Sequence, residues 1–275
     1  MLKKRLIFTL LYNQGQFMLS RNFRLQKVGD LKWLQSNYNF SYISFSIDEL
    51  IVLDVTRGER DTKAFCDALK ALTEGCFVPI AAGGGVRTIE HARTLLRSGA
   101  DKVVVNTALY ENEHFVNELA SEFGQQCIVA SMDIKRAPDG SYQVWAEYGS
   151  KCLEGSAAHW IEQVTNNAVG EIYLNSMDRD GTGQGYDLQL LDLLPQDMPK
   201  PVILAGGVGN ATHLAEGLAD THVDAVATAH LFNFVGDGLK QARQLLIASG
   251  VDLPIWDIQL LEQPLRTEET EQCLN

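Results

Sequence analysis

The chain of 275 residues is short of basic side chains. It contains 23 lysines and arginines against 35 aspartates and glutamates, which gives a formal net charge of -12. Such a balance repels the phosphates of nucleic acids and anionic membrane surfaces. The sequence also lacks an apolar run of about 18 residues, the least that a membrane-spanning helix needs. We therefore expect neither nucleic acid nor a membrane among the partners.

Cysteine is scarce as well. The five cysteines are odd in number, widely spaced and never in a C-x-x-C pattern, and the six histidines form no ligand pair. This argues against a disulfide framework and against a zinc site. The apolar run at residues 6–12 is too short for a signal peptide, and no small-x-small cleavage site follows it. We expect a reduced cytoplasmic protein without a metal or a cofactor.

What the sequence does contain is an alternation of short apolar runs with helical patterns. Runs rich in β-branched residues are typical of parallel strands buried on both faces. Between them, apolar stripes at spacings of three and four predict helices, with Thr88 or Asn210 at a start. Eight strand–helix units predict one (β/α)8 TIM barrel over residues 1–257, followed by a polar tail at residues 258–275. The predicted strands are residues 6–12, 50–55, 77–81, 102–105, 127–130, 171–174, 201–204 and 225–227.

A repeat divides this barrel into halves. Gly83-Gly-Gly-Val-Arg87 returns as Gly206-Gly-Val-Gly209, so that Gly206 follows Gly84 by 122 positions. Asn106-Thr-Ala108 recurs near Thr228-Ala229 at almost the same offset. Two half-barrels of four units each would produce this spacing.

Polar residues at the carboxyl ends of barrel strands are the first candidates for a site. The two glycine loops, each before a helix start, favour two phosphate sites for a phosphorylated small molecule; tight-turn chemistry alone is the alternative. Asp133 at the end of the fifth strand is a candidate general acid or base, or a carboxylate that pairs with Lys135 or Arg136. The candidates at this end are Gly84, Gly85, Asn106, Thr107, Asp133, Asp178, Asp180, Gly206, Gly207 and Thr228.

Four charged residues stand at the opposite ends of the strands. Each of them begins an apolar run, and two cations with two anions would neutralise one another on a barrel floor. From the residues alone, charged caps on the surface ends of the strands are the simpler interpretation. The four are Arg5, Glu49, Lys102 and Glu171.

Over residues 1 to about 252 the chain resembles the cyclase (synthase) subunit of imidazole glycerol phosphate synthase, from histidine biosynthesis. The resemblance is strongest in residues 48–56, 83–87, 98–107 and 133–136 and in Ser176-Met-Asp-Arg-Asp-Gly-Thr182 with Gly185-Tyr-Asp187.

The resemblance implies a partner and a set of roles. A glutaminase subunit docks on the N-terminal face of the family's barrel and supplies ammonia through a charged gate, which Arg5, Glu49, Lys102 and Glu171 match; Asp101 matches a residue near that interface. Gly84, Asn106 and Thr107 match one phosphate site, and Gly206 and Gly207 match the other. Asp133 matches one of two essential catalytic aspartates.

The sequence departs from the family at the reactive end. Leu11 stands where the other catalytic aspartate belongs, and Asp133 follows Leu11 by the same half-barrel offset of 122 positions. A leucine side chain cannot transfer protons. Further replacements at this end are Leu19, Ser20, Asn175, Ala205 and His230, and about four residues are inserted within residues 38–47.

This combination resembles paralogues encoded with surface-polysaccharide genes. In that branch the barrel keeps its glutaminase and helps a separate ATP-using sugar amidotransferase convert an acetamido sugar to an acetamidino sugar. Two alternatives stay open: an authentic cyclase subunit of histidine biosynthesis in which Asp133, Asp178 or Asp180 covers the lost role, and a non-catalytic scaffold that activates a glutaminase.

Overall fold

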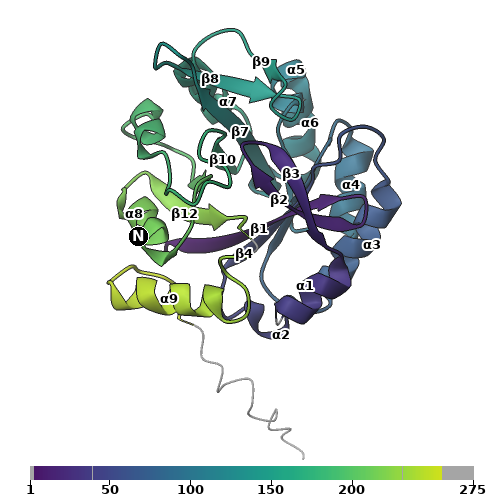
Figure 1. The fold of residues 1–275 in the computed structure, drawn as a ribbon. Helices are drawn as coiled ribbons and strands as arrows, with labels where there is room; N and C mark the ends of the chain where they lie inside the picture. The colour runs from purple at the N-terminus through teal and green to yellow at the C-terminus, as the bar shows by residue number, and fades with distance from the viewer. Residues whose placement is uncertain (1–2, 39, 231, 256–275) are drawn as a thin grey trace, which may run out of the picture.

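A closed barrel of parallel strands forms the centre of the molecule (Figure 1). The computed structural model describes residues 3–38, 40–230 and 232–255. Within them eight strands pair in sequence order, and the last pairs with the first through Arg5 and Ala225. This confirms the predicted (β/α)8 fold, whereas the predicted tail at residues 258–275 lies outside the described residues. The barrel strands are β1 (Arg5–Asn13), β4 (Glu49–Asp54), β5 (Ile80–Gly83), β6 (Lys102–Val105), β7 (Ile128–Arg136), β10 (Glu171–Ser176), β11 (Val202–Ala205) and β12 (Val223–Thr228).

Helices surround the barrel, as the apolar stripes predict (Figure 1). Thr88 and Asn210 cap α4 and α8, since their side chains accept hydrogen bonds from the backbone N–H of His91 and His213. Within the described part of the chain, none of the helices is long and apolar enough to cross a membrane. The helices are α1 (Leu31–Asn37), α2 (Phe40–Ile43), α3 (Thr62–Thr73), α4 (Ile89–Arg97), α5 (Ala108–Glu111), α6 (Glu113–Phe123), α7 (Ala157–Asn166), α8 (Ala211–Ala219) and α9 (Gly238–Ala248), with 3-10 turns η1 (Gln125–Cys127) and η2 (Leu188–Leu193).

Two details differ from the sequence prediction. The crossover from β10 to β11 contains the 3-10 helix η2 and no α-helix, so the sixth unit lacks the α-helix that a strand–helix unit implies. The third barrel strand begins at Ile80 instead of residue 77, and the Phe77 side chain is 82% exposed. Pro79 explains the late start, because proline has no N–H to donate to a neighbouring strand.

Two antiparallel hairpins at the carboxyl end of the barrel were not predicted. The first, β2 (Gln16–Arg21) with β3 (Arg24–Gly29), continues from β1; the second, β8 (Tyr142–Ala146) with β9 (Lys151–Cys152), continues from β7. Both follow the strand that opens a half-barrel. Leu11 pairs with Met18 of β2 in the first hairpin, and Asp133 pairs with Trp145 of β8 in the second. The structure thus places Leu11 and Asp133 at equivalent positions of the two halves.

Apolar side chains pack in two separate layers. The larger cluster fills the space between the strands and the surrounding helices. The smaller one fills the inside of the barrel and separates its two polar ends. Its members are Ile7, Ile51, Ala81, Val104, Val129, Tyr173, Ile203, Ala205, Ala225 and Ala227.

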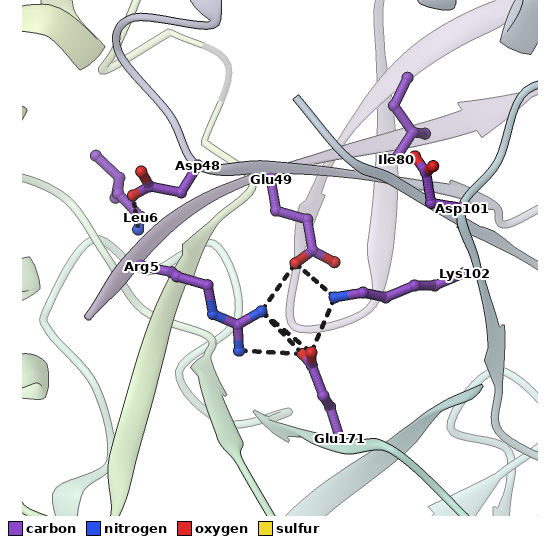
Figure 2. Close-up of polar contacts among 8 residues, drawn as sticks. All are labelled: Arg5, Leu6, Asp48, Glu49, Ile80, Asp101, Lys102 and Glu171. Atoms are coloured by element: carbon purple, nitrogen blue, oxygen red, sulfur yellow. Dashed lines mark hydrogen bonds and ion pairs between the residues drawn. The ribbon is translucent and has the colours of Figure 1, made fainter. Parts of the chain in front are cut away.

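A buried ion pair joins the last helix to the barrel floor. Arg243 of α9 donates two hydrogen bonds to the carboxylate of Asp48, at 2.9 and 2.8 Å, and both side chains are about 5% exposed. The same carboxylate accepts from the backbone N–H of Leu6 at 2.8 Å (Figure 2). Asp48 therefore links β1, β4 and α9.

Asp48→Ala should lower the free energy of unfolding by about 3–5 kcal/mol, because it leaves the Arg243 guanidinium buried without its counter-charge. Urea unfolding followed by circular dichroism measures the change. The double variant Asp48→Leu with Arg243→Met removes both charges and should recover most of the loss. A cost below about 1 kcal/mol for Asp48→Ala would contradict this account.

Candidate functional site

The alternation of strand residues decides which side chains enter the barrel. On β1 the inward positions are Arg5, Ile7, Thr9 and Leu11, one at each level from the amino to the carboxyl end. Charged residues therefore gather at the amino ends of the strands, apolar residues in the middle, and polar residues at the carboxyl ends. The two ends are described in turn.

The structure brings the four charged residues at the amino ends together (Figure 2). Arg5 donates to Glu49 at 2.9 Å and to Glu171 at 3.1 Å, and the Lys102 ammonium lies 2.9 Å from Glu49 and 2.8 Å from Glu171. Each cation thus contacts both anions. We call this set the four-charge ring. The four-charge ring lies inside the barrel floor. The simpler interpretation, in which these residues cap the surface ends of the strands, is therefore wrong.

Burial acts differently on the two carboxylates of the four-charge ring. Burial raises the pKa of Glu49, and the attraction of Lys102 offsets this only in part. Burial also opposes the charge on Glu171, but the attraction of Arg5 and Lys102 outweighs it and lowers the pKa. Glu49 also keeps one buried oxygen, Oε1, without a hydrogen bond. Glu49 is therefore the member that takes up a proton more readily.

Asp101 lies beside the four-charge ring on the same floor (Figure 2). Its carboxylate accepts from the backbone N–H of Ile80 at 2.8 Å. The side chain therefore holds the start of β5.

A cavity of about 220 Å³ opens at the carboxyl ends of the strands. All but one of the residues predicted for this end line it; the exception is Asp178, whose carboxylate accepts from the backbone N–H of Arg136 at 2.7 Å. The predicted residues that line the cavity are Gly84, Gly85, Asn106, Thr107, Asp133, Asp180, Gly206, Gly207 and Thr228.

The two glycine loops have matching geometry. Gly84 and Gly206 adopt φ values of 119° and 90°, in the region that favours glycine. A Cβ at Gly84 would lie 2.2 Å from the carbonyl oxygen of Asp54, and one at Gly206 would lie 2.6 Å from that of Ser176. Each loop therefore packs against the end of the preceding barrel strand, so glycine is required there with or without a bound phosphate.

Asp133 lies deep in the cavity between two amide side chains. Asn175 of β10 donates to its Oδ1 at 2.8 Å, and Asn106 donates to its Oδ2 at 2.9 Å. The alternative interpretation, in which Asp133 pairs with Lys135 or Arg136, is therefore wrong. Burial raises the pKa of Asp133 to about 6, although both amides favour the ionised form. Such a carboxylate is suited to proton transfer near neutral pH.

The position equivalent to Asp133 in the first half-barrel is apolar. Leu11 lies in the cavity wall, next to Leu53 on β4. The other carboxylates of the cavity wall already have partners. Asp54 accepts from the backbone N–H of Thr56, and Glu147 lies 3.6 Å from Lys151.

Asp180 holds the first hairpin over the cavity. Its carboxylate accepts from the Ser20 hydroxyl at 2.5 Å and from the backbone N–H of Phe23 at 2.9 Å. Burial raises the pKa of Asp180, and these two donors partly counteract that effect. The second hairpin is held at Thr107, whose hydroxyl accepts from the backbone N–H of Glu147 at 3.2 Å. Asp180 and Thr107 thus have structural partners within the chain.

Sequence reasoning missed two arginines, Arg57 and Arg60, which also line the cavity. They follow β4 directly, so their place after a strand end was the available signal. Tyr148, on the turn of the second hairpin, was missed with that hairpin. In the described part of the chain no group of His, Cys, Asp and Glu side chains is arranged to hold a metal ion.

Asn175→Ala should raise the pKa of Asp133 above about 6, by roughly one unit, because a hydrogen bond to the ionised form is lost. A titration of the side-chain carboxyl by ¹³C NMR measures this value. Thr9→Val is the matched control, since Thr9 lines the same cavity but bonds to Tyr173 at 3.3 Å. An unchanged or lower pKa in Asn175→Ala contradicts the role assigned to the amide.

Comparisons with known proteins agree with this arrangement. Residues 36–236 match the family described as "Histidine biosynthesis protein". A relative from Parasynechococcus marenigrum (strain WH8102), named "Putative imidazole glycerol phosphate synthase subunit hisF2", is 48% identical over 259 residues, which cover 94% of this chain and 96% of the relative. The chain therefore belongs to the histidine biosynthesis family, in its branch of imidazole glycerol phosphate synthase cyclase subunits.

Proposed function

We propose that this chain is the synthase subunit of a glutaminase-coupled complex. Ammonia enters through the four-charge ring and leaves at the cavity, where it helps a separate sugar amidotransferase convert an acetamido sugar to an acetamidino sugar. A glutaminase docks on the floor, at the amino ends of the strands, and an ATP-using sugar amidotransferase activates the acceptor carbon. The observation that supports this function best is an intact four-charge ring opposite a cavity in which Leu11 stands where the family resemblance implies a carboxylate.

The interior of the barrel fits a neutral cargo. Between the four-charge ring and Asp133 the wall is built from side chains such as Ile7, Ile51 and Val104. An ammonium ion would lose its hydration there without a counter-charge, which is costly, whereas ammonia carries no charge. The apolar layer therefore favours delivery of the neutral molecule.

Asp133 has a defined part in this proposal. With a pKa of about 6 it is ionised at pH 7 to 8 and can accept a proton from the nitrogen that attacks the activated carbon. Activation with ATP supplies the leaving group, so a second carboxylate on the facing half-barrel is not needed. The cyclase reaction of histidine biosynthesis, as the family resemblance implies it, uses two aspartates.

The name of the relative supports an alternative function, which is that of an authentic cyclase subunit of histidine biosynthesis. Under that alternative Asp133, Asp178 or Asp180 supplies the missing proton transfer, and Asp178 does not line the cavity. The structure weighs against Asp180, because its carboxylate already accepts from Ser20 and from the backbone of Phe23. The scaffold alternative, in which the barrel only activates a glutaminase, makes Asp133 dispensable.

The test offers the chain, with its glutaminase and ammonium, the aminoimidazole ribonucleotide precursor of the histidine pathway. The turnover rate should be lower than an ordinary enzyme rate of ~1 s⁻¹ by a factor of about 100 or more. Leu11→Asp should raise this turnover by about 100-fold, because it restores a proton-transfer group opposite Asp133. Leu11→Asn, similar in size but unable to transfer protons, is the control. Turnover near 1 s⁻¹ in the unaltered chain would establish the alternative.

Lys102→Met tests the four-charge ring. The change leaves Glu49 and Glu171 with Arg5 as their shared cation, and it should reduce glutamine-dependent product formation by roughly 10-fold or more. Product formation from added ammonium should change by less than about threefold, because free ammonia reaches the cavity from solvent. Lys200→Met is the control, since this lysine binds the carbonyl of Val169 outside the ring. Equal losses with glutamine and with ammonium would contradict entry through the ring.

A further inference from the structure

The first hairpin is basic, although the chain as a whole is acidic. Residues 14–29 contain Arg21, Arg24 and Lys27 and no aspartate or glutamate, whereas the whole chain has a formal net charge of -12. All three residues are exposed. We call these three cations the basic rim. The hairpin therefore presents a concentration of positive charge to its surroundings.

The basic rim is unfavourable for the hairpin itself. Arg21 of β2 lies directly opposite Arg24 of β3, and like charges at opposed positions of two strands destabilise their pairing. Between them, Asn22 and Phe23 have φ values of 48° and 62°, which a bulky side chain rarely adopts. Local stability does not account for these residues, so their explanation lies outside the hairpin.

No internal partner neutralises the basic rim. Within residues 3–38, 40–230 and 232–255, none of its three side chains forms an ion pair or a hydrogen bond. None of the three lines the cavity either, although Leu19, Phe23 and Leu25 of the same hairpin do. The counter-charge is therefore not a ligand inside the cavity. It has to approach the hairpin from outside the barrel.

The hairpin is held in place across the mouth of the barrel (Figure 1). Asn22 donates from its backbone N–H to the carbonyl oxygen of Asp180 at 2.9 Å, and from Nδ2 to that of Asp178 at 3.0 Å. Gly181 lies so close to the carbonyl oxygen of Ser20 that a Cβ would not fit. The basic rim is therefore a preorganised surface, which lowers the entropic cost of binding a partner.

The basic rim also lies at the outlet of the proposed ammonia path. Ammonia that escapes into water near neutral pH takes up a proton and ceases to be a nucleophile. The enzyme that consumes it therefore has to cover the outlet and exclude water. A protein in that position contacts the first hairpin, because Leu19 and Leu25 place β2 and β3 in the cavity wall.

We propose that the basic rim docks onto an acidic surface of the ATP-using sugar amidotransferase. The inference rests on the proposed function and deepens it, because it places that enzyme at the mouth of the barrel, opposite the glutaminase. An acidic surface neutralises Arg21 and Arg24 together and removes the repulsion between them. Complementary charges of this kind orient a partner and speed its association.

Protection of an edge strand is a simpler role for basic residues, since charged side chains prevent pairing with another sheet. β3 is such an edge, because it pairs with β2 alone, and this role accounts for Arg24 and Lys27. It does not account for Arg21, because β2 already pairs with both β1 and β3. The docking role accounts for all three cations.

Calorimetry with the full chain and the purified sugar amidotransferase of the same organism tests the inference. The double variant Arg21→Glu with Arg24→Glu should weaken this binding about 30-fold or more at low salt, because two attractive contacts become repulsive. Arg21→Gln with Arg24→Gln should weaken it about 10-fold, yet keep or raise the thermal stability of the chain, because it removes the repulsion within the hairpin. For the unaltered chain, ~500 mM salt should weaken binding about 10-fold, because salt screens exposed charges.

Lys63→Glu with Lys70→Glu is the matched control, because both are exposed lysines of α3 that do not line the cavity. It should change the affinity by less than about threefold, and circular dichroism of each variant verifies folding. An unaltered affinity in both arginine double variants overturns the inference, as does a lack of binding between the unaltered chain and the amidotransferase.

Binding of the chain to phosphatidylglycerol vesicles, lost in Arg21→Glu with Arg24→Glu, also overturns the inference, because it assigns the basic rim to a membrane. Glutamine-dependent product formation by the unaltered chain is a separate readout of the proposed function. Product formation together with unaltered affinities in the variants shows that the docking surface alone is wrong. Absence of product from the unaltered chain contradicts the proposed function instead.

Discussion

A lysine or arginine buried in a barrel is stable only when an opposite charge lies against it, and the floor of this molecule is built on that constraint. Arg5, Glu49, Lys102 and Glu171 come from four different barrel strands, yet each cation contacts both anions within about 3.2 Å. The arrangement requires strand registers that bring all four to one level. Closure of the barrel and pairing of the charges therefore depend on each other.

Glu171 at the floor and Asp133 at the mouth are buried carboxylates whose pKa values move in opposite directions. At the floor, Glu171 lies between two cations, and their attraction lowers its pKa despite burial. At the mouth, Asp133 has only the neutral amides of Asn106 and Asn175 as donors, and burial raises its pKa. Under the proposed function, the paired charges of the floor suit the entrance for ammonia, and a titratable carboxylate suits the end where a bond to nitrogen would form. An apolar layer separates the two environments.

Much of this architecture is predictable from the sequence, because parallel strands buried on both faces produce continuous apolar runs. The candidate residues also follow from their places at strand ends, and the cavity contains all those at the carboxyl ends except Asp178. The two hairpins are harder to predict from the sequence. Their turns place Asn22, Phe23, Glu147 and Tyr148 at positive φ, where glycine is usual, and tertiary contacts hold them there. Gly15 in the turn after β1, Gly140 in the turn after β7 and Gly149 in the turn after β8 are the local signals that the sequence offers.

Contacts between distant segments explain the remaining gaps. The amide of Asn175 reaches Asp133 because β10 pairs with β7 at that level, which no local pattern reveals. The same holds for Arg60, whose neighbours come from a glycine loop and from the second hairpin. The register between Leu11 and Met18 repeats that between Asp133 and Trp145. A duplicated frame of this kind offers redundancy, because one copy can exchange its reactive group while the backbone of both copies is kept. Evolution can then alter the chemistry of the mouth in one half at a time without disturbing the pairing that holds the cylinder closed.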